Sequence, residues 1–494
     1  MKLTLHNIGL IQHAEVKLDG ITVIVGNNST GKSTIGRALY LYCNSLNGMA
    51  QYIQNDRQKA ILQELNKRSE SLDLICKRII NAKRKRKLDE SQAQRKLTAA
   101  SLSTYSSDDE TKVREIINEY AKKHAALYNI DLLTFQKEKG FLQWISMTSD
   151  NVMDILEKSD DDLGKRRISE KLEENFGGQI TRIPHKGEIN DTHDFESYIE
   201  VENSSNEVNK IYFERNKKAG KDVCLSYLHN FAVDYTPVYI ENPRVIDKLS
   251  YQFLWGKEDT LEALFTPSSG EYKKSEGLND FDYLFQNLLS SLSSSQENLF
   301  NALKVLGMNT DPTMSQLEQY SENVNILEKE IDEIIGGLLV KSDQKGSKFA
   351  QDNLERNIEI YNMSTGIKAL SLLRIGIEKG CIESGGILIL DEPEINLHPE
   401  WQIKYAKIIV KMQRLLNLKI IITTHSPYFM QAIEYSSKLD GTFNKYHCYL
   451  AEYFKGQSRI SCVDQFPSLG YKKLVEAFAE LEQMKQQCER IDEV

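Results

Sequence analysis

The sequence predicts an α/β fold with a discontinuous core and two helical insertions. A continuous apolar run at 21–25 is followed by a glycine-rich loop and then by a helical pattern. Two further apolar runs, at 387–391 and 419–424, lie far downstream and each ends in polar residues. Runs of this length are typical of strands that are buried on both faces of a sheet. Long segments with helical spacing separate the runs, so we expect the core to be interrupted twice.

The composition is that of a folded chain with two or three compact regions, since 494 residues are 40% hydrophobic. The net charge of −9 argues against a chain that coats nucleic acid over its whole surface. The seven cysteines are scattered without a C-x-x-C pair, which favours a reducing compartment over a disulfide or zinc framework. No apolar run approaches the roughly 20 residues that span a bilayer, and residues 1–10 lack the apolar core of a signal peptide. We therefore expect a cytoplasmic protein without a membrane partner.

The N-terminal lobe is expected to comprise 1–46 and 173–246. Alternating apolar residues predict two strands ahead of the run at 21–25, and strand-like segments return between 179 and 240. The intervening segment, 47–172, is polar, contains no proline and has mostly helical spacing. It is expected to form a helical insertion.

A second helical region is expected at 247–337, followed by a C-terminal lobe at 338–494. The second region carries heptad-like apolar residues, for which core packing or a short hairpin is favoured because fewer than three heptads are present. These residues are Leu317, Val324, Leu327, Ile331 and Ile334. The C-terminal lobe ends in apolar residues at helical spacing, with core packing favoured and docking of a partner or another copy as the alternative. They are Leu474, Ala477, Phe478, Leu481 and Met484.

The stretch GNNSTGKST at 26–34 matches the P-loop pattern G-x-x-x-x-G-K-[ST]. Its glycines allow main-chain N–H groups to turn inward around a phosphate, Lys32 can reach the outer phosphates, and Ser33 can ligate Mg²⁺. The strand before the loop and the helix after it supply the context that the motif requires. The predicted nucleotide-binding residues are Gly26, Asn27, Asn28, Ser29, Thr30, Gly31, Lys32, Ser33 and Thr34.

Two downstream strands end in residues that suit phosphate chemistry. The apolar strand at 387–391 ends in Asp391 and Glu392. Asp391 is predicted to hold Mg²⁺ opposite Ser33, and Glu392 to polarise the attacking water as a general base. The next apolar strand is followed by His425, which is predicted to contact the γ-phosphate.

A serine-glycine turn at 364–366 opens an amphipathic helix. Ser364, Thr365 and Gly366 present a hydroxyl and unpaired N–H groups, which form a second phosphate cradle. Because the P-loop already binds the phosphate of its own chain, this cradle is expected to face a nucleotide held by another subunit. The alternative is an ordinary helix capped by Ser364 or Thr365.

In this order the motifs resemble those of ABC-type ATPases of the SMC, RecF and OLD group. The string DEPEINLHPE at 391–400 is particularly similar to OLD-like ATPases of bacterial anti-phage systems. The resemblance covers both ends of the chain. It implies an ABC-type core with a mixed sheet, ATP and Mg²⁺ as cofactors, and a homodimer that sandwiches two ATP molecules.

The sequence departs from this group at two motifs. The signature reads Ser-Thr-Gly-Ile-Lys, and Lys368 replaces the usual glutamine or glutamate. The glutamine of the Q-loop is also missing, since Glu241 and Asn242 close the strand ahead of the second helical region. The Q-loop role stays open, with Asn242 favoured because a neutral amide carbonyl can face Mg²⁺ or water.

Within this group the chain looks most similar to the PtuA family, the ATPases of Septu systems and of some retrons. That similarity implies a separate HNH nuclease partner of the PtuB kind and assembly beyond the dimer. OLD proteins carry a TOPRIM nuclease, which needs a glutamate and an Asp-x-Asp pair to hold metal ions. No Asp-x-Asp follows His425, the aspartates at 160–162 lie in a charged stretch, and the histidines form no H-N-H cluster. Any nucleic-acid cleavage is therefore expected to come from a partner.

A basic run at 77–87 lies in the first helical insertion, with seven Lys or Arg residues among eleven. It is either a solvated helix face or a DNA or RNA contact made through phosphates, because no aromatic residues interleave to stack bases. The densest part consists of Lys83, Arg84, Lys85, Arg86 and Lys87.

The favoured function is an ATP-hydrolysing subunit of a bacterial anti-phage defence complex that holds or regulates a separate effector nuclease. One alternative is a RecF/SMC-like DNA-repair ATPase that clamps DNA directly, although the heptads are too short for a long coiled coil. Another is an AriA-like ATPase of a PARIS system with a TOPRIM partner. A transporter ATPase is disfavoured by the long insertion in the N-terminal lobe.

Overall fold

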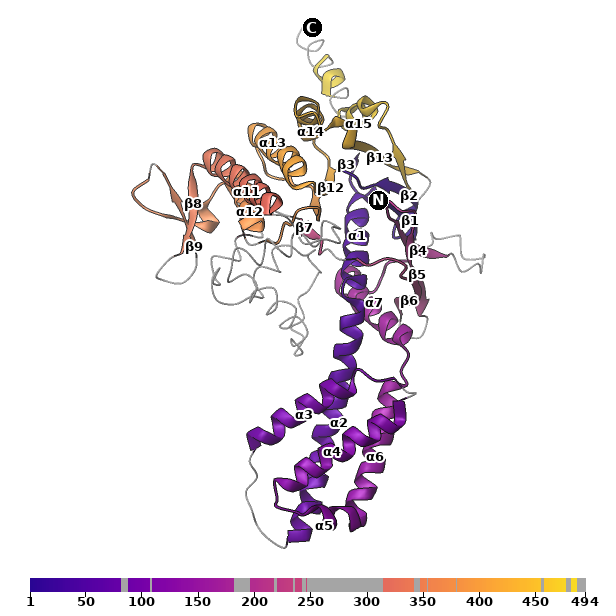
Figure 1. Cartoon of the computed structure of the whole chain (residues 1–494). Helices are drawn as coiled ribbons and strands as arrows, with labels where there is room; N and C mark the ends of the chain where they lie inside the picture. Colours follow the sequence, from indigo (N-terminus) through magenta and orange to yellow (C-terminus); the bar gives the residue numbers. More distant parts are fainter. Residues whose placement is uncertain are drawn as a thin grey trace. The chain divides into compact units, whose positions relative to one another are not determined.

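The computed structural model of the chain forms two compact units (Figure 1). The first comprises Met1–Asn47 and Ile168–Val494, and the second comprises Gly48–Arg167. The structure describes residues 1–80, 88–106, 109–181, 196–216, 220–233, 236–241, 246, 314–341, 347–352, 354–378, 380–454, 457–476 and 481–486.

The first unit is built around a mixed sheet of eleven described strands, in the order β6-β5-β4-β1-β2-β14-β13-β3-β12-β11-β7. This confirms the predicted α/β class with a mixed sheet. Its antiparallel part contains β1 (Lys2–Ile8), β2 (Ile11–Lys17), β4 (Ser197–Glu202), β5 (Val208–Asn216) and β6 (Lys221–Leu228). Buried and exposed residues alternate along β2, as expected for a strand with one solvated face.

Parallel strands form the other part of the sheet: β3 (Ile21–Gly26), β7 (Val238–Ile240), β11 (Ile387–Asp391), β12 (Lys419–Thr424) and β13 (Tyr446–Phe454). Every residue of β3, β7 and β11 is buried, which accounts for their continuous apolar runs. The strand β14 (Gln457–Cys462) pairs antiparallel with β13 and parallel with β2, and so joins the two parts of the sheet. Because β3, β11 and β12 are parallel neighbours, the residues that follow them meet at one edge of the sheet.

Helices cover both faces of the parallel strands. On one face α1 (Lys32–Leu46) approaches β11 closely, because a Cβ on Gly36 would lie only 2.7 Å from Cγ2 of Ile389. Leu388 and Leu390 point to the opposite face, where they pack with residues of the other helices. Those helices are α11 (Met314–Ile335), α12 (Thr365–Glu378), α13 (Pro399–Leu416) and α14 (Pro427–Leu439).

The heptad-like residues belong to α11, and Leu327 and Ile331 are fully buried in the core of the first unit. Core packing, one of the two arrangements favoured by the sequence, is therefore observed. After α11 a small antiparallel sheet contains β8 (Gly337–Lys341), β9 (Ser347–Gln351) and β10 (Ile358–Glu359). Short 3₁₀ helices occupy Ile360–Asn362 and Phe443–Lys445.

The expectation of core packing is wrong for part of the C-terminal segment. The helix α15 (Pro467–Leu474) ends at Leu474, which packs against the core. Leu481 and Met484 are instead 57% and 55% exposed. The expectation failed because apolar spacing predicts a helix face but does not indicate whether another surface packs against it. Ala477 and Phe478 lie outside the described residues.

The second unit is helical and has its own core. Its helices are α2 (Met49–Ile80), α3 (Leu88–Leu102), α4 (Glu110–Ala126), α5 (Leu132–Lys137) and α6 (Lys139–Leu156), and α7 (Asp160–Phe176) begins within it. Tyr120, Phe141 and Trp144 are buried in this core. A buried polar contact lies beside them, in which Asp73 bonds His124 at 2.7 Å and Tyr128 at 2.9 Å. No helix among the described residues is long and apolar enough to cross a membrane.

Candidate nucleotide-binding site

The P-loop connects β3 to α1 and has the backbone that its glycines permit. Gly31 has a φ of +78° and directly precedes α1, and Gly26 has a φ of +154°. A Cβ on Gly26 would lie 2.3 Å from the carbonyl oxygen of Ala451 on the neighbouring β13, so this position accepts only glycine. The nine residues predicted to bind the nucleotide run from the end of β3 through this turn into the start of α1, and Asn27, Asn28 and Ser29 are exposed.

Lys32 lies in the P-loop as a buried ammonium group with 3% exposure. Its Nζ donates to the main-chain oxygen of Asn27 at 2.8 Å, and the hydroxyl of Thr30 donates to the same oxygen at 2.8 Å. Burial lowers the pKa of Lys32, while the charges of Glu392 and Asp391 act in the opposite direction. A bound phosphate would add negative charge beside this ammonium, which makes the position well suited to an anion.

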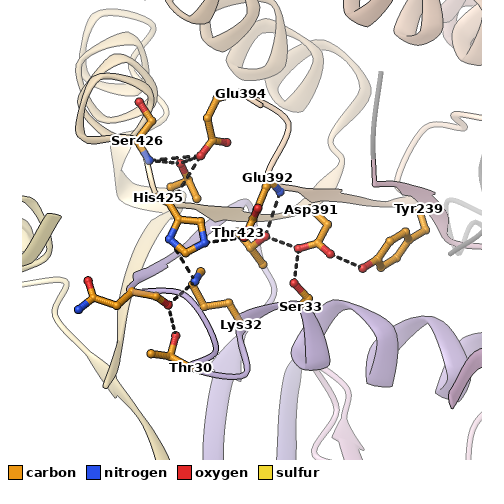
Figure 2. Close-up of polar contacts among 12 residues, drawn as sticks. Thr30, Lys32, Ser33, Tyr239, Asp391, Glu392, Glu394, Thr423, His425 and Ser426 are labelled. Atoms are coloured by element: carbon orange, nitrogen blue, oxygen red, sulfur yellow. Dashed lines mark hydrogen bonds and ion pairs between the residues drawn. The ribbon is translucent and has the colours of Figure 1, made fainter. Parts of the chain in front are cut away.

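Asp391 ends β11 beside the start of α1 (Figure 2). Its Oδ1 accepts a hydrogen bond of 2.8 Å from Oγ of Ser33 and another from the hydroxyl of Thr423. Hydroxyl and carboxylate oxygens are the ligands that Mg²⁺ prefers. No group of three His, Cys, Asp or Glu residues in the described part of the chain could hold a metal ion. Because Ser33 and Asp391 both offer oxygen ligands, they fit an Mg²⁺ ion that takes its remaining ligands from phosphates and water.

Glu392, Lys32 and His425 form a chain of polar contacts (Figure 2). Nε2 of His425 lies 2.5 Å from Oε1 of Glu392, and Nδ1 of His425 lies 3.5 Å from Nζ of Lys32. An ammonium group only donates, so Nδ1 accepts and Nε2 carries the proton that is donated to Glu392. This hydrogen bond holds the pKa of Glu392 below its ordinary value.

The backbone at Glu392 adopts a left-handed conformation. Glu392 has a φ of +50°, a conformation that costs a residue other than glycine about 1–2 kcal/mol. Its N–H donates at 3.1 Å to both the carbonyl and the hydroxyl oxygen of Thr423 on the adjacent strand. Strained residues of this kind cluster at functional sites.

The loop after β12 is held by Glu394, for which the sequence predicted no role. Oε1 of Glu394 accepts hydrogen bonds from the hydroxyl of Thr424, the N–H of His425 at 2.9 Å and the N–H of Ser426 at 3.2 Å. Glu394 is 6% exposed, and burial raises its pKa. Glu394 therefore fixes the main chain that carries His425.

The comparison with protein families agrees with this geometry. The AAA ATPase domain family matches residues 1–430. The chain belongs to the AAA ATPase domain family. The matched range includes the P-loop, Asp391, Glu392 and His425.

Solved structures of SMC head domains are similar to this chain over most of its length. The SMC head bound to the C-winged helix domain of ScpA shares 12% identity at a TM-score of 0.39, covering 95% of this chain and 98% of that one. The SMC head domain of Thermotoga maritima shares 11% identity at a TM-score of 0.31, covering 94% of this chain and 98% of that one. The SMC head domain with an extended coiled coil, bound to the C-terminal domain of ScpA derived from Pyrococcus furiosus, shares 13% identity at a TM-score of 0.35. The match covers 98% of each chain.

The predicted signature lies at the start of α12. Oγ of Ser364 accepts a hydrogen bond of 3.3 Å from the N–H of Ile367, the contact of a helix cap. A Cβ on Gly366 would lie 2.3 Å from the ring of Trp401. In the single chain Ser364 therefore acts as a helix cap, which is the alternative that the sequence left open. The close approach of Trp401 is sufficient to explain why residue 366 is a glycine.

Two predicted sites fall outside the described residues. They are the Q-loop candidate Asn242 and the basic residues Lys83, Arg84, Lys85, Arg86 and Lys87. Glu241, which precedes Asn242, forms an ion pair of 2.7 Å with Arg37 of α1. Lys77 and Arg78, the first part of the basic run, are exposed in the last turn of α2.

Sequence reasoning missed two hydroxyls that contact Asp391. Thr423 pairs with Asp391 in the register of β11 and β12, and Tyr239 donates to Oδ2 of Asp391 at 2.8 Å from β7. Both side chains lie in strands that the sequence predicted. The order of those strands in the sheet was the missing information, because it decides which side chains are neighbours.

Proposed function

We propose that this chain binds ATP with Mg²⁺ at the P-loop and hydrolyses it. The observation that carries the proposal is the hydrogen bond of 2.5 Å between Glu392 and His425. It joins the Glu392 carboxylate to His425, whose other ring nitrogen lies 3.5 Å from Nζ of Lys32. Glu392 directly follows Asp391, which accepts a hydrogen bond from Ser33. A cation site, a phosphate-binding lysine and a candidate base therefore adjoin one another. These are the parts that phosphoryl transfer to water requires.

Each side chain has a separate role in the proposed reaction. Lys32 and the N–H groups of the P-loop bind the outer phosphates, while Ser33 and Asp391 hold the cation. Mg²⁺ bound there would neutralise charge on the phosphates. Oε1 of Glu392 accepts the hydrogen bond from His425, so Oε2 is the atom that takes the proton of the attacking water. The lowered pKa of Glu392 keeps it ionised at neutral pH and hence able to act as a base.

We further propose that two chains share each nucleotide. In this arrangement Ser364, Thr365 and Gly366 of one chain face the phosphate held by the P-loop of another. Ser364 lies at a helix N-terminus, where N–H groups and the helix dipole favour an anion. This extends the proposal to a homodimer, with higher assembly implied by the PtuA-like resemblance.

The cellular role that we propose is control of a separate effector nuclease in a bacterial anti-phage defence complex. The support is the resemblance of DEPEINLHPE to OLD-like ATPases and the absence of a nuclease motif from the sequence. The ATP state would alter the contact between subunits and thereby release or activate the partner, as in other phosphate-ordered switches. An HNH protein of the PtuB kind is the expected effector.

Purified protein tests the proposal in two stages. The parental chain should release phosphate from ATP with Mg²⁺ and not with EDTA, and Glu392→Gln should bind ATP, fail to hydrolyse it and accumulate as a dimer. Turnover by Glu392→Gln at the parental rate would contradict the assignment of the base. Co-expression with the product of the neighbouring reading frame tests the role: an HNH partner supports it, a TOPRIM partner favours the AriA-like alternative, and DNA clamping without a nuclease favours the RecF/SMC-like one.

A further inference from the structure

Asp391 is 5% exposed, and three hydroxyl groups surround its carboxylate. Ser33 and Thr423 both donate to Oδ1. Tyr239 donates to Oδ2 from the opposite side at 2.8 Å (Figure 2). A carboxylate bonded through both oxygens cannot turn about its terminal torsion without breaking at least one of these contacts.

The position of the Tyr239 hydroxyl is set by tight packing. Tyr239 is fully buried at the centre of β7, where its backbone pairs with Ile389 of β11. Its ring meets that of Tyr40 edge-on, with the ring centres 5.9 Å apart. Gly36 leaves room for the ring, since a Cβ there would lie 3.3 Å from Cε2 of Tyr239. Gly36 and Tyr40 both belong to α1, the helix that also carries Ser33.

The strand β7, which carries Tyr239, is also tied to α1 at its end. Glu241, directly after β7, forms an ion pair of 2.7 Å with Arg37 of α1. The proton of the Tyr239 hydroxyl is directed to Oδ2 of Asp391.

We propose that Tyr239 is a positioning residue for the cation site, acting through Asp391. By fixing Oδ2 it keeps Oδ1 directed to the hydroxyl of Ser33. Because Ser33 donates its proton to Oδ1, the lone pairs of the Ser33 oxygen are left for a cation. Without the phenol, Asp391 can turn, and both oxygen ligands lose their alignment. This inference rests on the proposed binding of ATP with Mg²⁺.

The alternative is that the Tyr239 hydroxyl only satisfies a buried carboxylate and supports the fold. The two roles differ in what they predict for nucleotide binding without metal. A positioning role affects binding only when Mg²⁺ is present, whereas a structural role would damage the P-loop under both conditions.

Tyr239→Phe removes one oxygen and keeps the ring that packs on Gly36. Binding of a fluorescent ATP analogue is measured with Mg²⁺ and with EDTA, together with the Mg²⁺ concentration that gives half-maximal hydrolysis. We expect binding of the analogue with Mg²⁺ to weaken about 10-fold and the half-maximal Mg²⁺ concentration to rise about 10-fold, because one hydrogen bond to a charged group is lost. Binding of the analogue in EDTA should stay unchanged. The kcat at saturating Mg²⁺ should stay within about threefold of the parental value.

Tyr405→Phe is the matched control. Tyr405 is 1% exposed, and its hydroxyl has no hydrogen-bond partner within the described part of the chain. Its removal should change neither metal dependence nor nucleotide binding. The inference would be overturned if Tyr239→Phe and the parent had the same Mg²⁺ dependence. It would also be overturned if Tyr239→Phe bound the analogue equally weakly with Mg²⁺ and with EDTA, or if the variant lost its folded state. Failure of the parental chain to bind the analogue with Mg²⁺ would instead overturn the proposed function, and this inference with it.

Discussion

Nε2 of His425 lies 2.5 Å from Oε1 of Glu392, and its other ring nitrogen faces Lys32. Replacing His425 with alanine removes the group that orients the candidate base but leaves the P-loop intact. We expect kcat to fall about 10- to 100-fold, which is less than the roughly 100- to 10,000-fold effect of a general base, because Glu392 itself remains. KM should change less than about threefold. Steady-state ATP hydrolysis measures both. A parental kcat for His425→Ala would contradict the role assigned to this contact.

Lys32→Ala should abolish nucleotide binding. It removes the buried ammonium group that bonds Asn27, and no other lysine or arginine lies among residues 26–34. Equilibrium binding of a fluorescent ATP analogue tests this directly. Lys123→Ala is the matched control, because Lys123 is an exposed lysine of the helical unit that pairs with Glu119 at 2.6 Å. The control should bind as the parent does.

Gly366→Ala should destabilise the first unit. The added Cβ would lie 2.3 Å from the ring of Trp401, and overpacking of this kind costs about 1–3 kcal/mol. Thermal unfolding should show a lower midpoint, and a second substitution, Trp401→Leu, should recover part of the loss. A parental midpoint together with lost dimer formation would show instead that Gly366 serves the nucleotide and not the packing.

Stability should depend on pH through Glu383. Burial raises the pKa of Glu383 to about 7 from the ordinary 4.5, so the folded state binds this proton more tightly than the unfolded chain does. The stabilisation is full below pH 4.5 and is lost as the pH rises through about 7. Glu383→Gln should therefore gain stability relative to the parent between these pH values. Urea unfolding at a series of pH values measures the difference, with Glu355→Gln, at an exposed position, as the control; parallel curves for Glu383→Gln and the parent would contradict the prediction.

Local patterns were sufficient to predict the elements that carry the site. The apolar runs before Gly26, Asp391 and His425 are the buried parallel strands β3, β11 and β12. A short, continuous apolar run is typical of a strand that is buried on both faces of a sheet. The short β7 was also recognised, but its place next to β11 was not, so the contact between Tyr239 and Asp391 could not be anticipated.

Other parts of the site depend on geometry that residue spacing does not encode. Glu394 was visible in DEPEINLHPE, yet only the main-chain path after Thr424 shows that its Oε1 holds the loop with His425. Residue spacing could likewise not show that Leu481 and Met484 are exposed. Periodicity predicts an apolar helix face, and tertiary structure decides whether that face is covered.

Mixing two inactive variants tests most directly whether each nucleotide is shared between two chains. Lys32→Ala disables the P-loop, and Ser364→Arg blocks the opposing turn, so neither variant alone should hydrolyse ATP. In a mixed dimer with shared sites, one site combines the intact P-loop of one chain with the intact turn of the other. An equal mixture should then recover about a quarter of the parental activity if pairing is random. No recovery, in a mixture shown to contain the mixed dimer, would contradict the shared site.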